Sequence, residues 1–231
     1  IALFAVRKWL TRPLLWKLLG LVALGGLQGA IGWWMVSSGI GETTRVDVAP
    51  YRLMTHFILA LLIIAIVAWI WLDLGDRTRE PAPRAVQLTA RILLVAVFVQ
   101  MAAGALVAGL DAGRSYNDWP LMAGELVPSH YMETGLGLRS LFEGRAATQF
   151  NHRLIAYAIW AGSLAAAWAF RNGPLKRDFI VLAGLVSLQA VWGIFTLVHA
   201  APMNLALLHQ GIGVILTLAA VRLAWLTARR A

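Results

Sequence analysis

Long apolar segments alternate with short polar connections along the whole chain. A helix that crosses a bilayer needs about 20 consecutive, mostly apolar residues. Six segments reach that length, and they cover residues 14–36, 51–72, 88–110, 149–170, 179–198 and 204–226. Prolines stand at or near the starts of four of them, where a residue without an N–H is tolerated, at positions 50, 83, 174 and 202. The pattern predicts an all-α, polytopic membrane helical bundle with six transmembrane helices.

Composition supports the membrane class and removes several others. Of the 231 residues, 60% are hydrophobic and 13% are charged, and the mean hydropathy is +0.71. A soluble domain is near 25% charged, so an ordinary soluble fold is excluded. The net charge of +9 does not indicate nucleic-acid binding, because the bases lie in short connections between apolar segments. The chain has no cysteine, which excludes disulfides, thiolate metal sites and iron–sulfur clusters.

The charges of the connections alternate along the chain. Connections on the cytoplasmic side of a membrane carry an excess of Lys and Arg. The residues before the first segment, two connections and the last residues are basic, through Arg7, Lys8, Arg12, Arg77, Arg79, Arg84, Arg91, Arg171, Lys176, Arg177, Arg229 and Arg230. The other three connections are acidic or uncharged. In the first of them, Glu42 and Asp47 outweigh Arg45, and the long one between the third and fourth segments carries Asp111, Asp118, Glu125, Glu133 and Glu143. We therefore expect both ends of this chain on the cytoplasmic or matrix side.

A short motif recurs in the first, third and fifth apolar segments. Each copy has an apolar residue, a glutamine, three further residues and a glycine, as in Gln28 with Gly32, Gln100 with Gly104, and Gln189 with Gly193. Residues four apart share one face of a helix. Small residues there allow close helix approach, and a glutamine can form a hydrogen bond across the interface. One copy is ordinary membrane packing, but three in the same orientation predict a duplicated helical hairpin.

The helix after each copy carries a histidine near its start, at His56, His152 and His209. All three helices run from outside to inside in the predicted topology. A rise of 1.5 Å per residue puts each histidine about 5–9 Å below the outer end. Burying an ionisable side chain within a membrane span costs free energy, so such a residue is first interpreted as functional. The alternative for each is a structural hydrogen bond between helices.

Heme suits these histidines better than zinc or a proton relay. The six predicted segments contain no Asp or Glu, so a carboxylate-supported zinc site is poorly supplied. Heme iron needs one or two axial imidazoles in an apolar slot. His152 and His209 make a pair, and His56 lacks a partner, so a duplicated design predicts a fourth hairpin with a fourth histidine.

Two arginines stand beside these histidines, next to the predicted outer interface. Arg153 adjoins His152, and Arg52 lies one turn before His56. A guanidinium can hold the carboxylates of a heme bidentately; the alternative for both is a side chain that reaches the interface without a ligand. Two other histidines, His130 and His199, fall in connections and are interpreted as interfacial or solvated.

Several longer motifs resemble the heme A synthase family of the alphaproteobacterial and mitochondrial type. They cover essentially the whole chain and lie at residues 26–29, 32–39, 51–53, 108–113, 116–117, 120–122, 149–157 and 208–210, with His56 and Gly124. Trp119 stands where the family leads us to expect phenylalanine. The family has eight spans in two pseudo-repeated four-helix halves. By resemblance, residues 1–87 are what remains of the N-terminal, substrate half, and residues 88–231 are the C-terminal half.

The resemblance also implies a chemistry. His152 and His209 would bind heme b through its iron, with Arg153 beside it. His56 and Arg52 would bind the substrate heme O, which a heme O synthase supplies. The oxidoreductase would convert a ring methyl to a formyl group, through two hydroxylations and loss of water, for cytochrome oxidase assembly. It would sit in the bacterial or mitochondrial inner membrane with an unidentified electron donor and no nucleic acid.

One departure from the family bears on activity. The first two helices of the family are absent from this chain, and they carry the partner histidine and a carboxylate placed for catalysis. We therefore expect the catalytic acid upstream of Ile1, the C-terminal heme site to form, and these residues alone to lack synthase activity. The alternative function is a heme b-binding electron-transfer module without catalysis. A small transporter is a weaker third, because the repeats share one orientation.

The long connection between the third and fourth segments favours the synthase over an electron carrier. Long ordered loops are often functional. Its residues Asp111, Asn117, Asp118 and Trp119 are predicted to cover the mouth of a heme pocket, and the alternative is a solvated connector.

Overall fold

A computed structural model describes residues 2–40, 47–75 and 82–228. These residues form α-helices, two short 3-10 helices and one isolated β-bridge between Met122 and Glu125. The elements are α1 (Ala2–Val6), α2 (Arg12–Val36), α3 (Pro50–Leu74), α4 (Arg84–Gly109), η1 (Ala112–Arg114), η2 (Gly137–Arg139), α5 (Ser140–Glu143), α6 (Arg145–Ala169), α7 (Lys176–Val198) and α8 (Met203–Thr227). Several charges used to predict the topology lie outside the described residues, namely Glu42, Arg45, Arg77, Arg79, Arg229 and Arg230.

The six long helices match the six predicted segments and extend beyond most of their ends. Five of them, α2, α3, α4, α7 and α8, are long and apolar enough to cross a membrane. The helix α6 is as long, but its first turns carry Arg145, Gln149, Asn151 and Arg153, which lower its hydropathy. The protein is therefore an all-helical, polytopic integral membrane protein, whereas the sixth span and the sidedness of the termini stay predictions.

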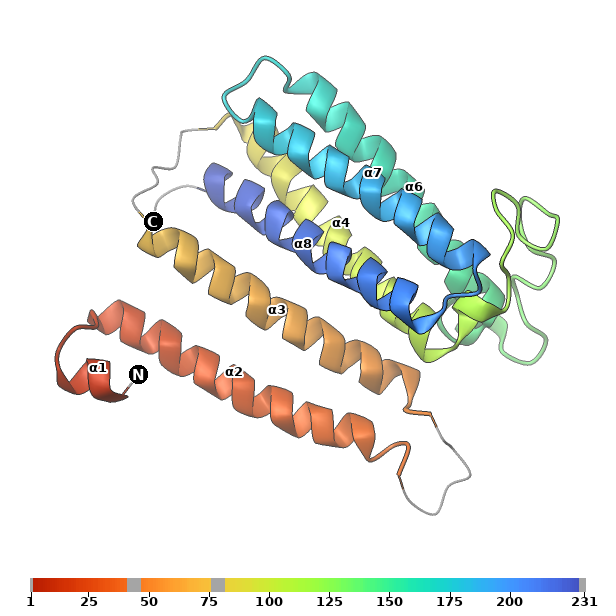
Figure 1. Ribbon diagram of the computed structural model, residues 1–231, viewed down its shortest axis with the longest axis horizontal. Helices are drawn as coiled ribbons and strands as arrows, with labels where there is room; N and C mark the ends of the chain where they lie inside the picture. Colours follow the sequence, from red (N-terminus) through yellow and green to blue (C-terminus); the bar gives the residue numbers. More distant parts are fainter. Residues whose placement is uncertain (1, 41–46, 76–81, 229–231) are drawn as a thin grey trace.

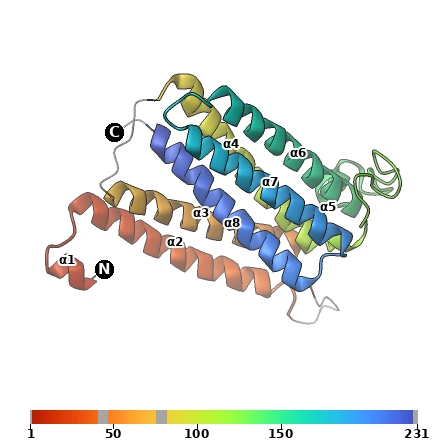
Figure 2. The same ribbon diagram turned by 45° about the horizontal axis from the view of Figure 1, so that its top comes forward.

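Four helices form a closed ring. The helix α4 packs against α6 and α8, and α7 packs against the same two, so α6 and α8 face each other diagonally. The helix α3 packs against α4 and α8, and α2 packs against α3 at the edge (Figures 1 and 2). We call the end that holds the starts of α2, α4 and α7 the inner end. The outer end holds the long connection between α4 and α6 (Figure 1).

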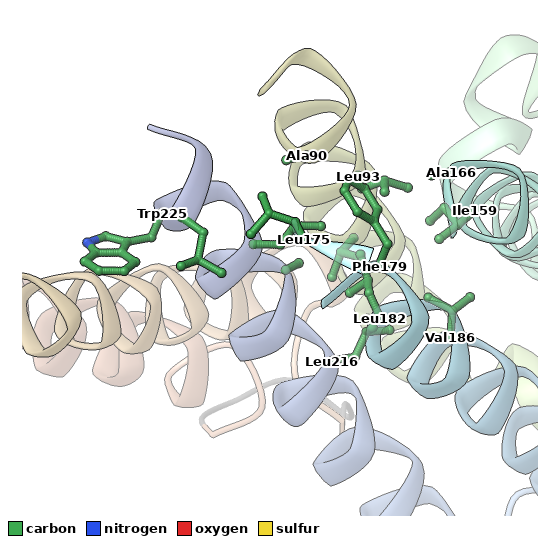
Figure 3. Close-up of a cluster of buried hydrophobic side chains, with 14 of the residues drawn as sticks. Ala90, Leu93, Ile159, Ala166, Leu175, Phe179, Leu182, Val186, Leu216 and Trp225 are labelled. Atoms are coloured by element: carbon green, nitrogen blue, oxygen red, sulfur yellow. The ribbon is translucent and has the colours of Figure 1, made fainter. Parts of the chain in front are cut away.

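Apolar side chains fill the ring from its middle to its inner end. Phe179 and Leu182 of α7 meet Leu216 of α8, Leu93 of α4 and Ile159 of α6 (Figure 3). Phe179 and Leu182 are each only 1% exposed. Because lipid is as apolar as these side chains, such a core stabilises a membrane protein by close packing rather than by escape from water. The packing fixes the four helices against one another below the histidines.

Two carboxylates lie within helices at the inner end, each next to a predicted apolar segment that itself contains none. Asp73 belongs to the last turns of α3, where it pairs with Lys17 at 3.3 Å and accepts a hydrogen bond from Trp225 Nε1 at 2.8 Å. Asp178 belongs to the first turn of α7 and pairs with Arg222 of α8. These acids fall inside the helices because helical hydrogen bonding continues past the apolar segment into the polar boundary. Both acids join neighbouring helices.

Candidate functional site

The three histidines occupy equivalent places in their helices. His56 is the seventh residue of α3, His152 the eighth of α6 and His209 the seventh of α8. The helical rise puts them about 9–11 Å from the starts of those helices, slightly deeper than predicted because the helices begin earlier. The three helices start at the outer end (Figure 1). The chain therefore presents three imidazoles at one level of the bundle.

Each histidine is held by the glutamine of the preceding repeat. In the second copy, the side-chain Nε2 of Gln100 donates to the backbone carbonyl oxygen of His152 at 3.1 Å. The same contact measures 3.1 Å for Gln28 with His56 and 3.0 Å for Gln189 with His209. The glutamine thus spans two adjacent helices three times, α2 to α3, α4 to α6 and α7 to α8. The motif predicts a bond across an interface, but its acceptor, a backbone carbonyl, could not be read from the sequence.

The glutamine amide also lies against the imidazole ring. Gln100 Nε2 is 3.1 Å from Nδ1 and 3.2 Å from Nε2 of His152, and Gln28 Nε2 is 3.2 Å from both ring nitrogens of His56. The lone pair or N–H of each ring nitrogen lies in the ring plane and points away from the other nitrogen. An atom nearly equidistant from both therefore lies over the ring rather than along either direction. This placement orients the ring and leaves the in-plane directions of both nitrogens open.

The glycine of each repeat gives the ring its space. A Cβ added to Gly104 would lie 3.1 Å from Cε1 of His152. The corresponding distances to Cε1 are 2.9 Å at Gly32 for His56 and 2.8 Å at Gly193 for His209. The distances at Gly32 and Gly193 would require the ring to move, and that at Gly104 is tighter than an ordinary contact, so a larger residue would displace the ring. Glutamine and glycine together form a cradle for one imidazole, repeated three times.

His152 and His209 come from the diagonal helices of the ring. Each is cradled by a different one of the two remaining helices, α4 and α7. Nδ1 of His209 is buried and has no hydrogen-bond partner among the described residues. The side-chain Oε1 atoms of the three cradle glutamines are likewise buried without a partner in that part of the chain. Unpaired buried polar atoms are rare in folded proteins, so they mark this level of the bundle as a site.

The guanidinium of Arg153 anchors the outer connection from below. Its Nη1 donates to the backbone carbonyls of Asp118 at 3.1 Å and Leu121 at 2.9 Å. Its Nη2 donates to the carbonyl of Tyr116 at 3.2 Å and to Oε1 of Gln149 at 3.3 Å. Arg153 is only 9% exposed, and its Nε has no partner among the described residues. Propionate binding by Arg153 remains a prediction, in which Nε is the donor that the loop does not use.

Three further residues fix the outer connection. Gln149 Nε2 donates to the carbonyls of Ala112 and Tyr116 at 3.0 Å each. Asn117 Nδ2 donates to the carbonyl of Leu197 near the end of α7 at 2.9 Å. The Trp119 indole donates to the hydroxyl of Tyr157 at 2.9 Å. The connection is thus pinned across the outer ends of α6 and α7, and is more than a solvated chain.

Asp118 organises the tip of the same connection. Its carboxylate accepts from the backbone N–H of Gly124 at 2.9 Å and of Ala123 at 3.0 Å. These bonds, that of Gly124 foremost, lower the pKa of Asp118 below its ordinary value of 3.8. Asp111, predicted with Asp118 to cover the mouth of a heme pocket, is exposed and pairs with Arg114 at 3.4 Å, and its role there stays a prediction.

Arg52 of α3 contacts the outer end of α2. Its Nη1 donates to the carbonyl oxygen of Trp34 at 2.8 Å and lies 3.4 Å from the hydroxyl of Ser37. The guanidinium carbon stacks 4.7 Å from the centre of the Trp34 ring. These contacts hold Arg52 one turn above His56, and its role toward a ligand remains a prediction. His130 and His199 are exposed, as expected.

Comparisons with known proteins point to one family. Residues 1–221 match the profile of the family described as cytochrome oxidase assembly protein. The chain is 70% identical over 224 residues to a protein of Hyphomonas neptunium named heme A synthase. The matched region covers 97% of this chain and 64% of that protein. Proteins of the same name are 46% identical over 236 residues in Bradyrhizobium diazoefficiens, covering 98% and 64%, and 44% identical over 232 residues in Caulobacter sp., covering 96% and 66%.

The chain thus spans about two thirds of the length of these relatives, 64–66% for the three named. No solved structure matches it.

Proposed function

Because this chain belongs to the cytochrome oxidase assembly protein family, we propose that it acts as a heme A synthase. The proposed reaction converts heme O to heme A by oxidation of a ring methyl to a formyl group, through two hydroxylations and loss of water. The protein would work in the bacterial inner membrane, receive heme O from a heme O synthase, draw electrons from a separate donor and serve cytochrome oxidase assembly. The single observation that carries the proposal is the imidazole cradle, repeated three times at one level.

The resident cofactor in this proposal is heme b, held by His152 and His209. Several features support the fit: the two imidazoles stand on diagonal helices, glycine leaves space beside each ring, and His209 Nδ1 is buried without a partner among the described residues. A heme bound in this way supplies one-electron chemistry. Gln100 and Gln189 would fix the two ring planes, while Arg153 would hold the outer connection closed over the site and keep water out.

The substrate heme would bind at His56. The cradle of Gln28 and Gly32 around His56 repeats the geometry at the other two histidines, which supports the same kind of ligand. Arg52 lies one turn nearer the outer end and would pair with the propionates, since a guanidinium matches a carboxylate bidentately. Residues 1–87 would then form part of the substrate half, and residues 88–231 the heme b half.

A second function has an observation in its favour. The helices α4, α6, α7 and α8 close into a ring that contains both His152 and His209. Such a ring is sufficient for a heme b-binding electron-transfer module. In that case the His56 cradle would serve helix packing alone.

One expression experiment separates the two functions. The reading frame that encodes this chain is expressed in a host that supplies heme O and lacks its own heme A synthase, and extracted hemes are separated. A synthase yields heme A, and His56→Ala abolishes it, whereas His199→Ala, an exposed control, does not. Extraction of heme b alone from the unaltered protein, under conditions where a known synthase is active, contradicts the synthase proposal and supports the electron-transfer module.

A further inference from the structure

An apolar cavity lies between α2 and the rest of the bundle, on the inner side of His56. Its volume is about 610 Å³, within the range of small-molecule sites. Four helices line it, and its side chains include Leu21 and Leu24 of α2, Leu62 and Ile66 of α3, and Phe98 of α4. The helix α2 lines one side of the cavity, and none of its residues is buried.

The cavity lies on the inner side of the His56 cradle, along the same two helices. Leu24 lies one helical turn inward of Gln28, and Leu62 lies six residues inward of His56, which places the outer part of the cavity about 6–9 Å below the cradle. The same two helices thus carry both features. At the inner end the lining includes Lys17, whose Nζ pairs with Asp73 at 3.3 Å. The space therefore runs from about 6–9 Å below the cradle to a polar boundary at the inner end.

The chemistry of the proposed substrate fits this direction. Heme O differs from heme b in a long isoprenoid chain, attached on the edge of the porphyrin away from the propionates. Propionates need the water boundary at the outer end, because burying a carboxylate without a partner is costly. With the iron at His56, the opposite edge of the porphyrin points inward, toward Leu24 and Leu62.

We propose that this cavity is the binding site for the isoprenoid chain of the substrate heme. The inference rests on the proposed function, because it takes His56 as the place of the substrate iron. Lipid outside the protein is as apolar as the lining, so the cavity selects the chain by shape and packing. The cavity would thereby make the His56 site prefer heme O over heme b, which carries no such chain.

Filling the cavity from α2 tests the proposal. Gly20 lines the cavity, and a Cβ added there meets no atom within 4 Å, so Gly20→Phe places a ring in the space without a backbone clash. Gly25→Phe is the matched control, because Gly25 lies on the same helix, meets no atom within 4 Å and does not line the cavity. Leu24→Trp is a second variant that fills the cavity, in its outer part.

The measurement is equilibrium binding of heme O and of heme b to purified protein, counting only the binding that His56→Ala removes. Gly20→Phe is expected to weaken heme O by about ten- to hundredfold, the cost of overpacking, and to leave heme b unchanged; Gly25→Phe leaves both unchanged. Unaltered heme O binding in Gly20→Phe and Leu24→Trp, or equal weakening of both hemes, overturns the cavity proposal alone. If His56→Ala leaves heme O binding entirely unchanged, so that no binding depends on His56, the proposed function is overturned.

Discussion

The side-chain amide of Gln189 donates to the backbone carbonyl of His209 across the interface between α7 and α8, at 3.0 Å. A backbone carbonyl in the middle of a helix already accepts a hydrogen bond from within that helix. The glutamine therefore adds an interaction that only a precise approach of the two helices permits. Its repetition at Gln28 and Gln100 indicates that positioning of the histidine, rather than helix packing in general, explains the motif.

Replacement of Gln189 by leucine should loosen that position. The shape is nearly kept, but the bond to the His209 carbonyl is lost, at a cost of about 0.5–1.5 kcal/mol. Because the His209 ring is then no longer held by the glutamine, the midpoint potential of the bound heme should also shift. Potentiometric titration and denaturant unfolding measure the two effects. Gln210→Leu, at an exposed neighbour of His209, should leave both values unchanged, and equal shifts in the two variants would argue against a positioning role.

Gly193→Ala should displace the imidazole directly. Its Cβ would lie 2.8 Å from Cε1 of His209, so the ring or the helix has to move, at about 1–3 kcal/mol. Heme content per protein should fall, as measured by the pyridine hemochrome absorbance. Gly184→Ala on the same helix meets no atom within 4 Å and should retain full heme content. Full content in Gly193→Ala would mean that the glycine does not define the ring position.

Much of the architecture follows from the hydrophobic pattern alone. The spacing of apolar segments predicts the six long helices, and the resemblance identifies the family. The same pattern ends the predicted segment of α3 before Asp73, which is still helical, and starts that of α6 after Arg145, where the helix already begins. The reason is that hydropathy marks the membrane core, whereas helical hydrogen bonding extends into the interface. The polar first half of α6 is where hydropathy gives the weakest signal.

The contacts of the site were less accessible from sequence. The motif of Gln100 and Gly104 was recognised, but its partner His152 is 52 residues from Gln100. Only the equivalent depth of the histidines in the next helices could have linked them. For Arg153 the sequence predicted propionate binding, whereas its Nη groups bind three loop carbonyls and Gln149. Backbone acceptors leave no residue-type signal, so this role could not be predicted.

Arg153→Lys should release the outer connection although it keeps the positive charge. A lysine ammonium cannot span the carbonyls of Tyr116, Asp118 and Leu121 as the planar guanidinium does. Limited proteolysis within residues 115–135 should become faster, and hydrogen exchange there should increase. Arg114→Lys, an exposed change in the same connection, is the control. Equal proteolysis of the two variants would remove Arg153 from the anchoring role.

The tip of that connection should loosen in acid through Asp118. The folded pKa of Asp118 lies below its ordinary value of 3.8. The carboxylate therefore contributes stability that is fully present above that ordinary value and is lost as pH falls through the folded pKa. Hydrogen exchange at the Ala123 and Gly124 amides, corrected for intrinsic rates, should rise only below about pH 4. Asp118→Asn should show raised exchange at neutral pH and no such transition; a transition that persists in this variant would assign it to another group.

The most direct test of the central claim is electron paramagnetic resonance of the purified ferric protein with His152→Ala or His209→Ala. Two axial imidazoles make a heme low-spin. We predict one low-spin signal in the unaltered protein that is lost or converted to high-spin in each variant, and that is retained in His199→Ala. A low-spin signal that persists unchanged in His152→Ala or His209→Ala would contradict the assignment of these two histidines as the heme ligands.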